Sequence, residues 1–136
     1  MARTENIFVN EFKNRTKRFA IETLKLCDEL PFNQNSTRII ASQLGRSASS
    51  TAANYRAACV SRSAKEFVAK MSISLEESDE SSFWLELLDE GDFYTNKERI
   101  KNLLGESEQL TKIIGKARFT ASNNLNNGIN SLNPKN

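Results

Sequence analysis

Three charged residues near the middle of the chain are spaced so that they could meet: Arg46, Glu77 and Glu80. The two segments that carry them are both helical in pattern and adjoin near residue 62. If these helices are antiparallel, residues whose numbers add up to about 125 lie level with one another, which brings Arg46 within reach of either glutamate. We interpret the three residues as a hydrogen-bonded ion pair that fixes helix register. A site that touches a ligand directly is the alternative.

The best local cluster of positive charge lies in the first predicted helix. It consists of Lys13, Arg15, Lys17 and Arg18, and Arg56 extends it once the chain has folded. Such a cluster suits phosphate groups but does not read a base sequence by itself. We therefore predict that these residues contact nucleic acid, with a solvated basic face as the alternative.

Charge is unevenly distributed along the chain, although the total is only +2. Residues 1–62 hold ten Lys and Arg against five Asp and Glu, whereas residues 63–104 hold five against ten. The remaining residues, 105–136, hold four against two. The basic first half could pair with the acidic third segment inside the fold, or it could be offered to phosphate.

The residue types needed for catalysis are scarce. The chain contains no histidine, which excludes Ser–His and Cys–His nucleophilic systems and the Glu-x-x-His motifs of di-iron bundles. It also contains no glycine-rich phosphate loop. Cys27 and Cys59 each lie in an apolar helical pattern, which favours buried free thiols over a disulfide or a metal site. We expect a non-enzymatic protein with no metal site and no cofactor.

Four segments have helical period, and no segment alternates convincingly with the period of a strand. The predicted helices cover about residues 11–30, 36–62, 63–90 and 95–120. Short links between helices make neighbours antiparallel. The predicted fold is therefore all-α, an antiparallel up-down-up-down four-helix bundle.

Local sequence signals mark the boundaries of the later helices. Two capping boxes, from Ser63 to Glu66 and from Thr95 to Glu98, each place a hydroxyl three residues before a glutamate. Gly91 is placed as the residue that follows the third helix. These signals predict that the third and fourth helices begin at the two boxes.

The domain organisation expected from the sequence is simple. Residues 1–10 form a polar N-terminal extension, residues 11–120 form the bundle, and residues 121–136 form an Asn- and Ser-rich disordered tail. The first residues lack the apolar core of a signal peptide, and no apolar run approaches a membrane span. We expect a cytoplasmic protein of bacterial type.

Two polar stripes carry a resemblance to a known family. The residues that carry it most specifically are Arg46, Ser47, Ser50 and Asn54 on the second predicted helix, and Glu77, Glu80 and Trp84 on the third. With these residues the chain resembles the four-helix-bundle family that is named for the intervening sequences of 23S ribosomal RNA genes. The resemblance covers about residues 10–120. In the family pattern a glutamate commonly follows the asparagine by three residues, where this chain has Ala57.

The resemblance implies a left-handed antiparallel bundle that assembles as a homo-oligomer, in several members a pentameric barrel. A related branch serves diversity-generating retroelements as the accessory subunit of a reverse transcriptase, where a basic barrel engages nucleic acid. By resemblance, this protein binds RNA or DNA, or acts as an accessory subunit to a nucleic-acid enzyme such as a reverse transcriptase. The alternative is a protein–protein scaffold with no direct nucleic-acid contact.

Overall fold

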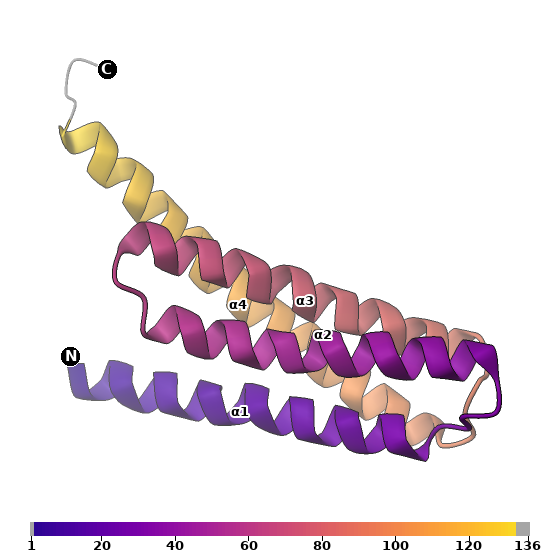
Figure 1. The fold of residues 1–136 in the computed structure, drawn as a ribbon. Coiled ribbons are helices and arrows are strands. Elements are labelled where there is room, and N and C mark those ends of the chain that lie inside the picture. The colour runs from indigo at the N-terminus through magenta and orange to yellow at the C-terminus, as the bar shows by residue number, and fades with distance from the viewer. Residues whose placement is uncertain (1, 133–136) are drawn as a thin grey trace.

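The computed structural model describes the backbone of residues 2–132 and the side chains of residues 7–128. Its helices are α1 (Ala2–Glu29), α2 (Asn35–Cys59), α3 (Ala64–Glu90) and α4 (Lys97–Leu132). Each helix runs antiparallel to the one before it (Figure 1). The predicted all-α, up-down-up-down four-helix bundle is confirmed. Over residues 2–132, no helix has both the length and the apolar composition needed to cross a membrane.

The four helices are not equally well packed against one another. Contacts are extensive between α1 and α2, between α2 and α3, and between α3 and α4, but few between α1 and α4. Side-chain polar contacts between α1 and α4 include Arg15 with Glu106 and Arg99 with Glu29. α4 runs obliquely behind the other helices, and its C-terminal part projects away from them (Figure 1). The bundle is therefore open between the start of α1 and the second half of α4.

The apolar core runs along the axis of the bundle and draws on all four helices. Leu26, Leu44, Leu85, Leu110 and Ile114 are fully buried in it. Buried apolar positions recur at helical spacing, as Ile40, Leu44 and Ala48 do on α2, because a helix that packs on one side must present one apolar stripe. Their burial supplies the main favourable term for folding.

A second layer of the core is built from hydroxyl side chains rather than from leucines. The hydrogen bonds that cross between helices in this layer include Ser47–Ser81 (2.9 Å), Ser74 to the carbonyl of Thr51 (2.9 Å), Ser78–Thr111 (2.6 Å) and Ser82–Ser107 (2.7 Å). We call these eight residues the hydroxyl seam. It joins α3 to α2 on one side and to α4 on the other. Small side chains let the helices approach closely, and each of the eight hydroxyls in the seam has a hydrogen-bond partner.

Both ends of the chain are more helical than the sequence predicts. α1 begins at Ala2 rather than near residue 11, so the predicted extension is helical from residue 2. Phe8 stacks on Phe12 with ring centroids 6.1 Å apart, which continues the apolar stripe toward the N-terminus. α4 continues through the Asn- and Ser-rich segment to Leu132, because an established helix gains a hydrogen bond with each added residue. Residues 133–136 of the predicted tail lie outside the described residues.

The two predicted capping boxes have different outcomes. Ser63 caps α3, and its hydroxyl accepts a hydrogen bond from the backbone N–H of Glu66 at 3.0 Å. The Glu66 carboxylate accepts from the backbone N–H of Arg62 at 2.9 Å, and this bond lowers the pKa of Glu66. The second prediction, that Thr95 caps the fourth helix, is wrong by one residue. The cap of α4 is Asn96, whose side-chain oxygen accepts a hydrogen bond from the backbone N–H of Arg99 at 3.2 Å.

The turn after α3 depends on two adjacent residues. Gly91 keeps a helical φ of −78°, whereas Asp92 takes the left-handed conformation with φ 59°. The sequence places Gly91 directly after the third helix, and α3 does end at Glu90, but the left-handed residue is the next one, Asp92. A side chain at position 91 would overlap the ring of Phe93. Gly91 is therefore needed for space rather than for a positive φ.

Candidate nucleic-acid interface

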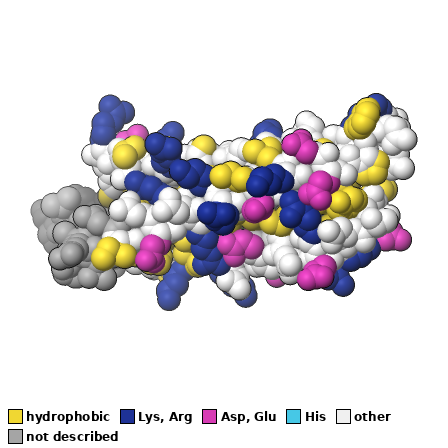
Figure 2. Space-filling model, turned by 90° about the horizontal axis from the view of Figure 1, so that it is seen from below, with side chains coloured by type: hydrophobic (Ala, Val, Ile, Leu, Met, Phe, Trp, Pro, Cys, Tyr) yellow, Lys and Arg dark blue, Asp and Glu magenta, His cyan; other side chains and the backbone are white. Residues whose placement is uncertain are grey.

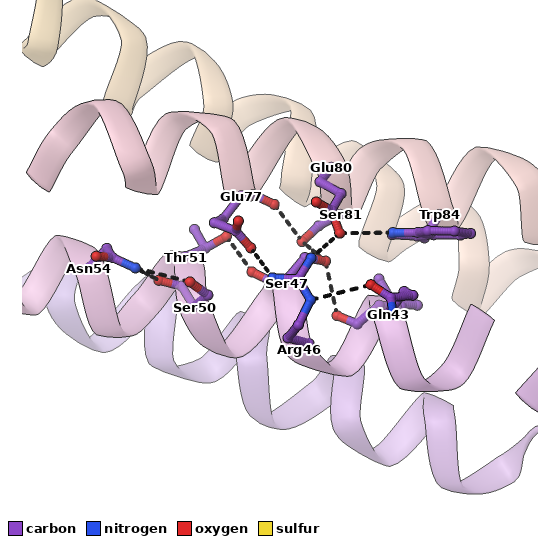
Figure 3. A network of polar contacts seen from close by, with 11 residues as sticks. Gln43, Arg46, Ser47, Ser50, Thr51, Asn54, Glu77, Glu80, Ser81 and Trp84 are labelled. Carbon is purple, nitrogen blue, oxygen red and sulfur yellow. Dashed lines mark hydrogen bonds and ion pairs between the residues drawn. The ribbon is translucent and has the colours of Figure 1, made fainter. Parts of the chain in front are cut away.

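A network of polar contacts joins α2 to α3 at Arg46 (Figure 3). The Arg46 guanidinium donates to Glu77 Oε2 at 2.8 Å and also to Glu80 Oε2. These contacts raise the pKa of Arg46, with the hydrogen bond to Glu80 contributing most. Glu80 also accepts from the indole N–H of Trp84 at 3.1 Å, and Gln43 accepts from Arg46 Nε at 3.3 Å. The acceptors of this network therefore take three of the five N–H donors of the guanidinium, one from each nitrogen, and tie it to both α2 and α3.

We expect Arg46→Ala to lower the free energy of unfolding by about 1 kcal/mol. The effect is modest because the Arg46 side chain is 47% exposed, so solvent screens its two ion pairs. The matched control is Arg62→Ala, whose ion pair with Glu66 spans 3.6 Å and whose side chain is 91% exposed. Urea denaturation should show a clear loss for Arg46→Ala and almost none for Arg62→Ala. Equal losses would mean that Arg46 does not hold α2 and α3 in register.

The remaining residues of the sequence motif lie on the same side of α2 and α3. Ser47 belongs to the hydroxyl seam. Asn54 donates to the backbone carbonyl and to the hydroxyl of Ser50, both at 2.9 Å, so these two residues bond to each other within α2 (Figure 3). Trp84 is half-buried and contacts Phe83 edge to face. Ala57 lies half-buried one turn after Asn54. Arg46, Ser47, Glu77 and Glu80 therefore join α2 to α3, whereas the side-chain bonds of Ser50, Asn54 and Trp84 stay within their own helices.

A groove between α1 and α2 collects three of the five predicted phosphate contacts. Lys13, Lys17 and Arg56 line it, and its volume is about 460 Å³. Lys13 and Lys17 lie one turn apart on α1, and Arg56 lines the groove from α2. No carboxylate is found among the described residues that line the groove. We call it the basic groove.

The side of the basic groove that α2 forms carries small side chains, which leave space between α1 and α2. Ser49, Ala52 and Ala53 line it, together with Asn14 and Ala20 of α1. A hydroxyl and an amide beside three cations offer neutral hydrogen-bonding groups as well as charge. This combination fits a phosphate with its flanking sugar. The sequence prediction missed these residues, although the run of small residues from Gly45 to Asn54 was a visible signal.

Arg15 and Arg18 lie outside the basic groove. Arg15 faces α4, where Nε and Nη2 donate to the two carboxylate oxygens of Glu106 at 2.8 Å each, and Nη2 donates to Gln109 at 2.8 Å. The bond to Glu106 raises the pKa of Arg15. Arg18 is exposed on α1. Neighbours in sequence point in different directions on a helix, so the predicted cluster divides between two faces.

Positive charge is spread along the face on which α1 lies. Figure 2 shows Lys and Arg side chains along this face, with Asp and Glu side chains between them toward one end and the lower rim. The face is therefore mixed in sign, and the basic groove is its purely cationic part. Ionic strength should screen any attraction by this face, because its charges lie in water.

Neither cysteine has the features of a catalytic thiol. Cys27 and Cys59 are both free and half-buried. Burial raises the pKa of Cys27 to about 11, so its thiol is neutral at physiological pH. Over the described residues, no group of three or more Cys, Asp or Glu side chains is placed to hold a metal ion.

Comparison with known proteins places the chain in a family. The profile of the 23S rRNA-intervening sequence proteins matches residues 10–116. Among solved structures, a protein of unknown function of the S23 ribosomal protein family from Bacteroides thetaiotaomicron is 27% identical, with a TM-score of 0.70. The alignment covers 78% of this chain and 96% of that one. No curated protein matches the chain significantly. The resemblance inferred from the polar stripes is thus confirmed, and the chain belongs to the family of 23S rRNA-intervening sequence proteins.

Proposed function

We propose that this protein binds RNA through the basic groove, as a non-enzymatic homo-oligomer. The observation that carries the proposal is the convergence of Lys13, Lys17 and Arg56 on one groove, with no carboxylate among its described lining residues. Phosphate contacts of this kind supply most of the sequence-independent affinity for nucleic acid. The family, which is named for an insertion in a ribosomal RNA, favours RNA over DNA as the ligand.

The proposal has two finer parts. The protein assembles with copies of itself, as a pentamer by the family resemblance, and it serves as accessory subunit to a nucleic-acid enzyme such as a reverse transcriptase. Assembly would place several copies of the basic groove on one particle and so raise the avidity for a long strand. Native mass spectrometry of the purified protein measures the number of subunits.

We expect the triple variant Lys13→Gln, Lys17→Gln and Arg56→Gln to bind RNA at least tenfold more weakly at about 50 mM salt. The reason is the loss of three phosphate contacts. The slope of log affinity against log salt should become shallower by about 2 to 3. Fluorescence anisotropy with a labelled RNA hairpin, and with a DNA hairpin of the same sequence, measures both quantities.

The matched control replaces Lys65, Lys101 and Lys112, which are all exposed and do not line the basic groove. This control removes the same net charge but leaves the basic groove intact. If the groove is the site, the control should lower the affinity for RNA much less than the groove variant does. Equal effects of the two triple variants would refute the groove as the site. Tighter binding of the DNA hairpin would refute RNA as the preferred ligand.

A protein–protein scaffold is the second candidate, and one observation favours it. The apolar side chains of Ile73, Phe83 and Leu87 are exposed on α3. Exposed apolar groups gathered on one element are typical of a surface that meets another protein. The same titration separates the two functions, because a pure scaffold would leave both hairpins unbound at low salt.

A further inference from the structure

The apolar stripe of α4 continues after the helix leaves the bundle. Ile114 is a fully buried member of this stripe. At the same helical spacing, the sequence continues the stripe at Leu125, Ile129 and Leu132. This last part of α4 projects away from the other three helices (Figure 1). We call residues 121–132 the arm.

The composition of the arm does not favour a helix that stands alone. Eight of its twelve residues are Asn, Ser or Gly, which are weak helix formers. Helices of this length are marginal in isolation, and most of the stability of a helix in a protein comes from packing of its apolar side. The arm cannot fold back onto its own bundle, because α4 is one unbroken helix from Lys97 to Leu132. The stripe of the arm therefore needs a surface from outside its own chain.

A hollow lies at the same end of the bundle, where α1 and α4 diverge. All four helices contribute to its lining, and its volume is about 390 Å³. Phe12, Tyr55 and Ile114 are buried around it, whereas Phe8, which also lines it, is 55% exposed. We call it the apolar hollow. A helix laid between α1 and α4 could place the side chains of one face in it.

The arm and the apolar hollow agree in charge and in number. The sequence has no charged residue from Phe119 to Pro134, and the described lining of the hollow includes no Lys, Arg, Asp or Glu. Each chain carries one arm and one hollow. A second copy of the chain therefore supplies the missing partner of both, in equal numbers. Contacts between two different surfaces of identical chains build rings or filaments.

We propose that the arm of one copy packs into the apolar hollow of the next copy. This inference rests on the homo-oligomer of the proposed function, and it names the contact that builds it. Leu125, Ile129 and Leu132 supply the apolar side of the arm, and the rings around the hollow, such as Phe8 and Phe67, receive it. The apolar hollow shares no described lining residue with the basic groove, so each chain keeps its own RNA site.

The first test places charge on the arm. The double variant Ile129→Glu and Leu132→Glu brings two carboxylates to the apolar stripe, where burial would leave them without a counter-ion. The matched control, Asn126→Glu and Asn130→Glu, adds the same charges to the opposite side of the same segment. We expect the dissociation constant of the oligomer to rise at least tenfold in the arm variant and to change little in the control. Native mass spectrometry over a dilution series measures both constants.

The second test places charge in the apolar hollow. Phe8→Glu alters a residue that lines it, whereas Ile7→Glu, the control, alters a neighbour that is 52% exposed and does not line it. We expect Phe8→Glu alone to weaken assembly at least tenfold. Circular dichroism reports whether each variant is folded. If Phe8→Glu is not folded, the arm variant and its control decide alone.

A mixing experiment tests the pairing of the two surfaces directly. The arm variant keeps an intact hollow, and Phe8→Glu keeps an intact arm, so one complete contact remains when the two chains are mixed. We expect the mixture to form dimers with one chain of each kind, which neither variant forms alone. A mixture of folded variants that stays monomeric would overturn the pairing.

The outcomes separate this inference from the proposed function. If the wild-type protein assembles and the arm variant assembles as tightly as its control, the contact is refuted and the homo-oligomer stands. A wild-type protein that is monomeric at every concentration would overturn both. Binding of the labelled RNA hairpin to the monomeric arm variant reports on the basic groove alone, and it should persist at the affinity of a single site.

Discussion

Replacing Ser81 with leucine should lower the free energy of unfolding by about 3–5 kcal/mol. Ser81 is fully buried in the hydroxyl seam, where its hydroxyl lies 2.9 Å from that of Ser47 and 3.0 Å from the backbone carbonyl of Glu77. The larger side chain has no space between α2 and α3, so it would force the two helices apart. It would also remove one of the two partners of the Ser47 hydroxyl. Urea denaturation followed by circular dichroism measures the loss.

Two controls separate crowding from hydrogen bonding. Ser81→Ala removes the hydroxyl alone and should cost only about 1 kcal/mol, since Ser47 keeps the carbonyl of Leu44 as an acceptor. Ser42→Leu adds the same side chain at an exposed position of α2 and should change stability by less than about 0.5 kcal/mol. If Ser81→Leu were as stable as Ser81→Ala, the close approach of α2 and α3 would be refuted.

Phe19→Ala should lower the free energy of unfolding by about 3–5 kcal/mol. Phe19 is the large aromatic side chain that anchors the middle of α1 in the core, and it is only 2% exposed. α1 has few contacts with α4, so the cavity left by this ring weakens a helix that depends mainly on its packing against α2. The matched control on the same helix is Ile21→Ala, because Ile21 is 46% exposed and should lose less than about 1 kcal/mol.

The Phe19 variant also tests how α1 is attached. If α1 is held mainly by its core side chains, limited proteolysis of Phe19→Ala should cut within α1 before it cuts within α3. Simultaneous cleavage of both helices would show instead that the bundle opens as one unit. Because Lys13 and Lys17 are carried by α1, the variant should also weaken RNA binding when it is measured near its melting temperature.

The helical periods were enough to predict the fold class and most helix boundaries. The apolar stripe and the Ser63 cap are local features, so a single sequence reveals them. The hydroxyl seam was not predicted, because serines at core spacing on α3 resemble a solvent-exposed face. Ser74, Ser78 and Ser81 in fact recur at intervals of four and three residues, which is a helical stripe of small residues. The N-terminal turns of α1 were missed because polar residues there conceal the stripe that includes Phe8.

The candidate site was only partly accessible from the sequence. Counting across the turn brings Arg46 level with Glu77 and Glu80 because antiparallel helices have a fixed rise per residue, and the structure gives these contacts. The basic groove could not be found in this way, because closeness in sequence does not determine which side of a helix a residue occupies. Arg15 lies two residues from both Lys13 and Lys17, yet it faces Glu106 on α4.

The hydroxyl seam has a consequence for how this chain emerges during synthesis. α4 is made after the other three helices, so the side of α3 that it will cover faces water while those three are already able to pack. In many bundles that side would be a row of leucines, and unfinished chains would adhere to one another through it. Here part of it consists of Ser78 and Ser82, whose hydroxyls can bond to water until Thr111 and Ser107 arrive. We therefore expect the nascent protein to be less prone to aggregate before α4 is complete than a bundle with leucines at these positions.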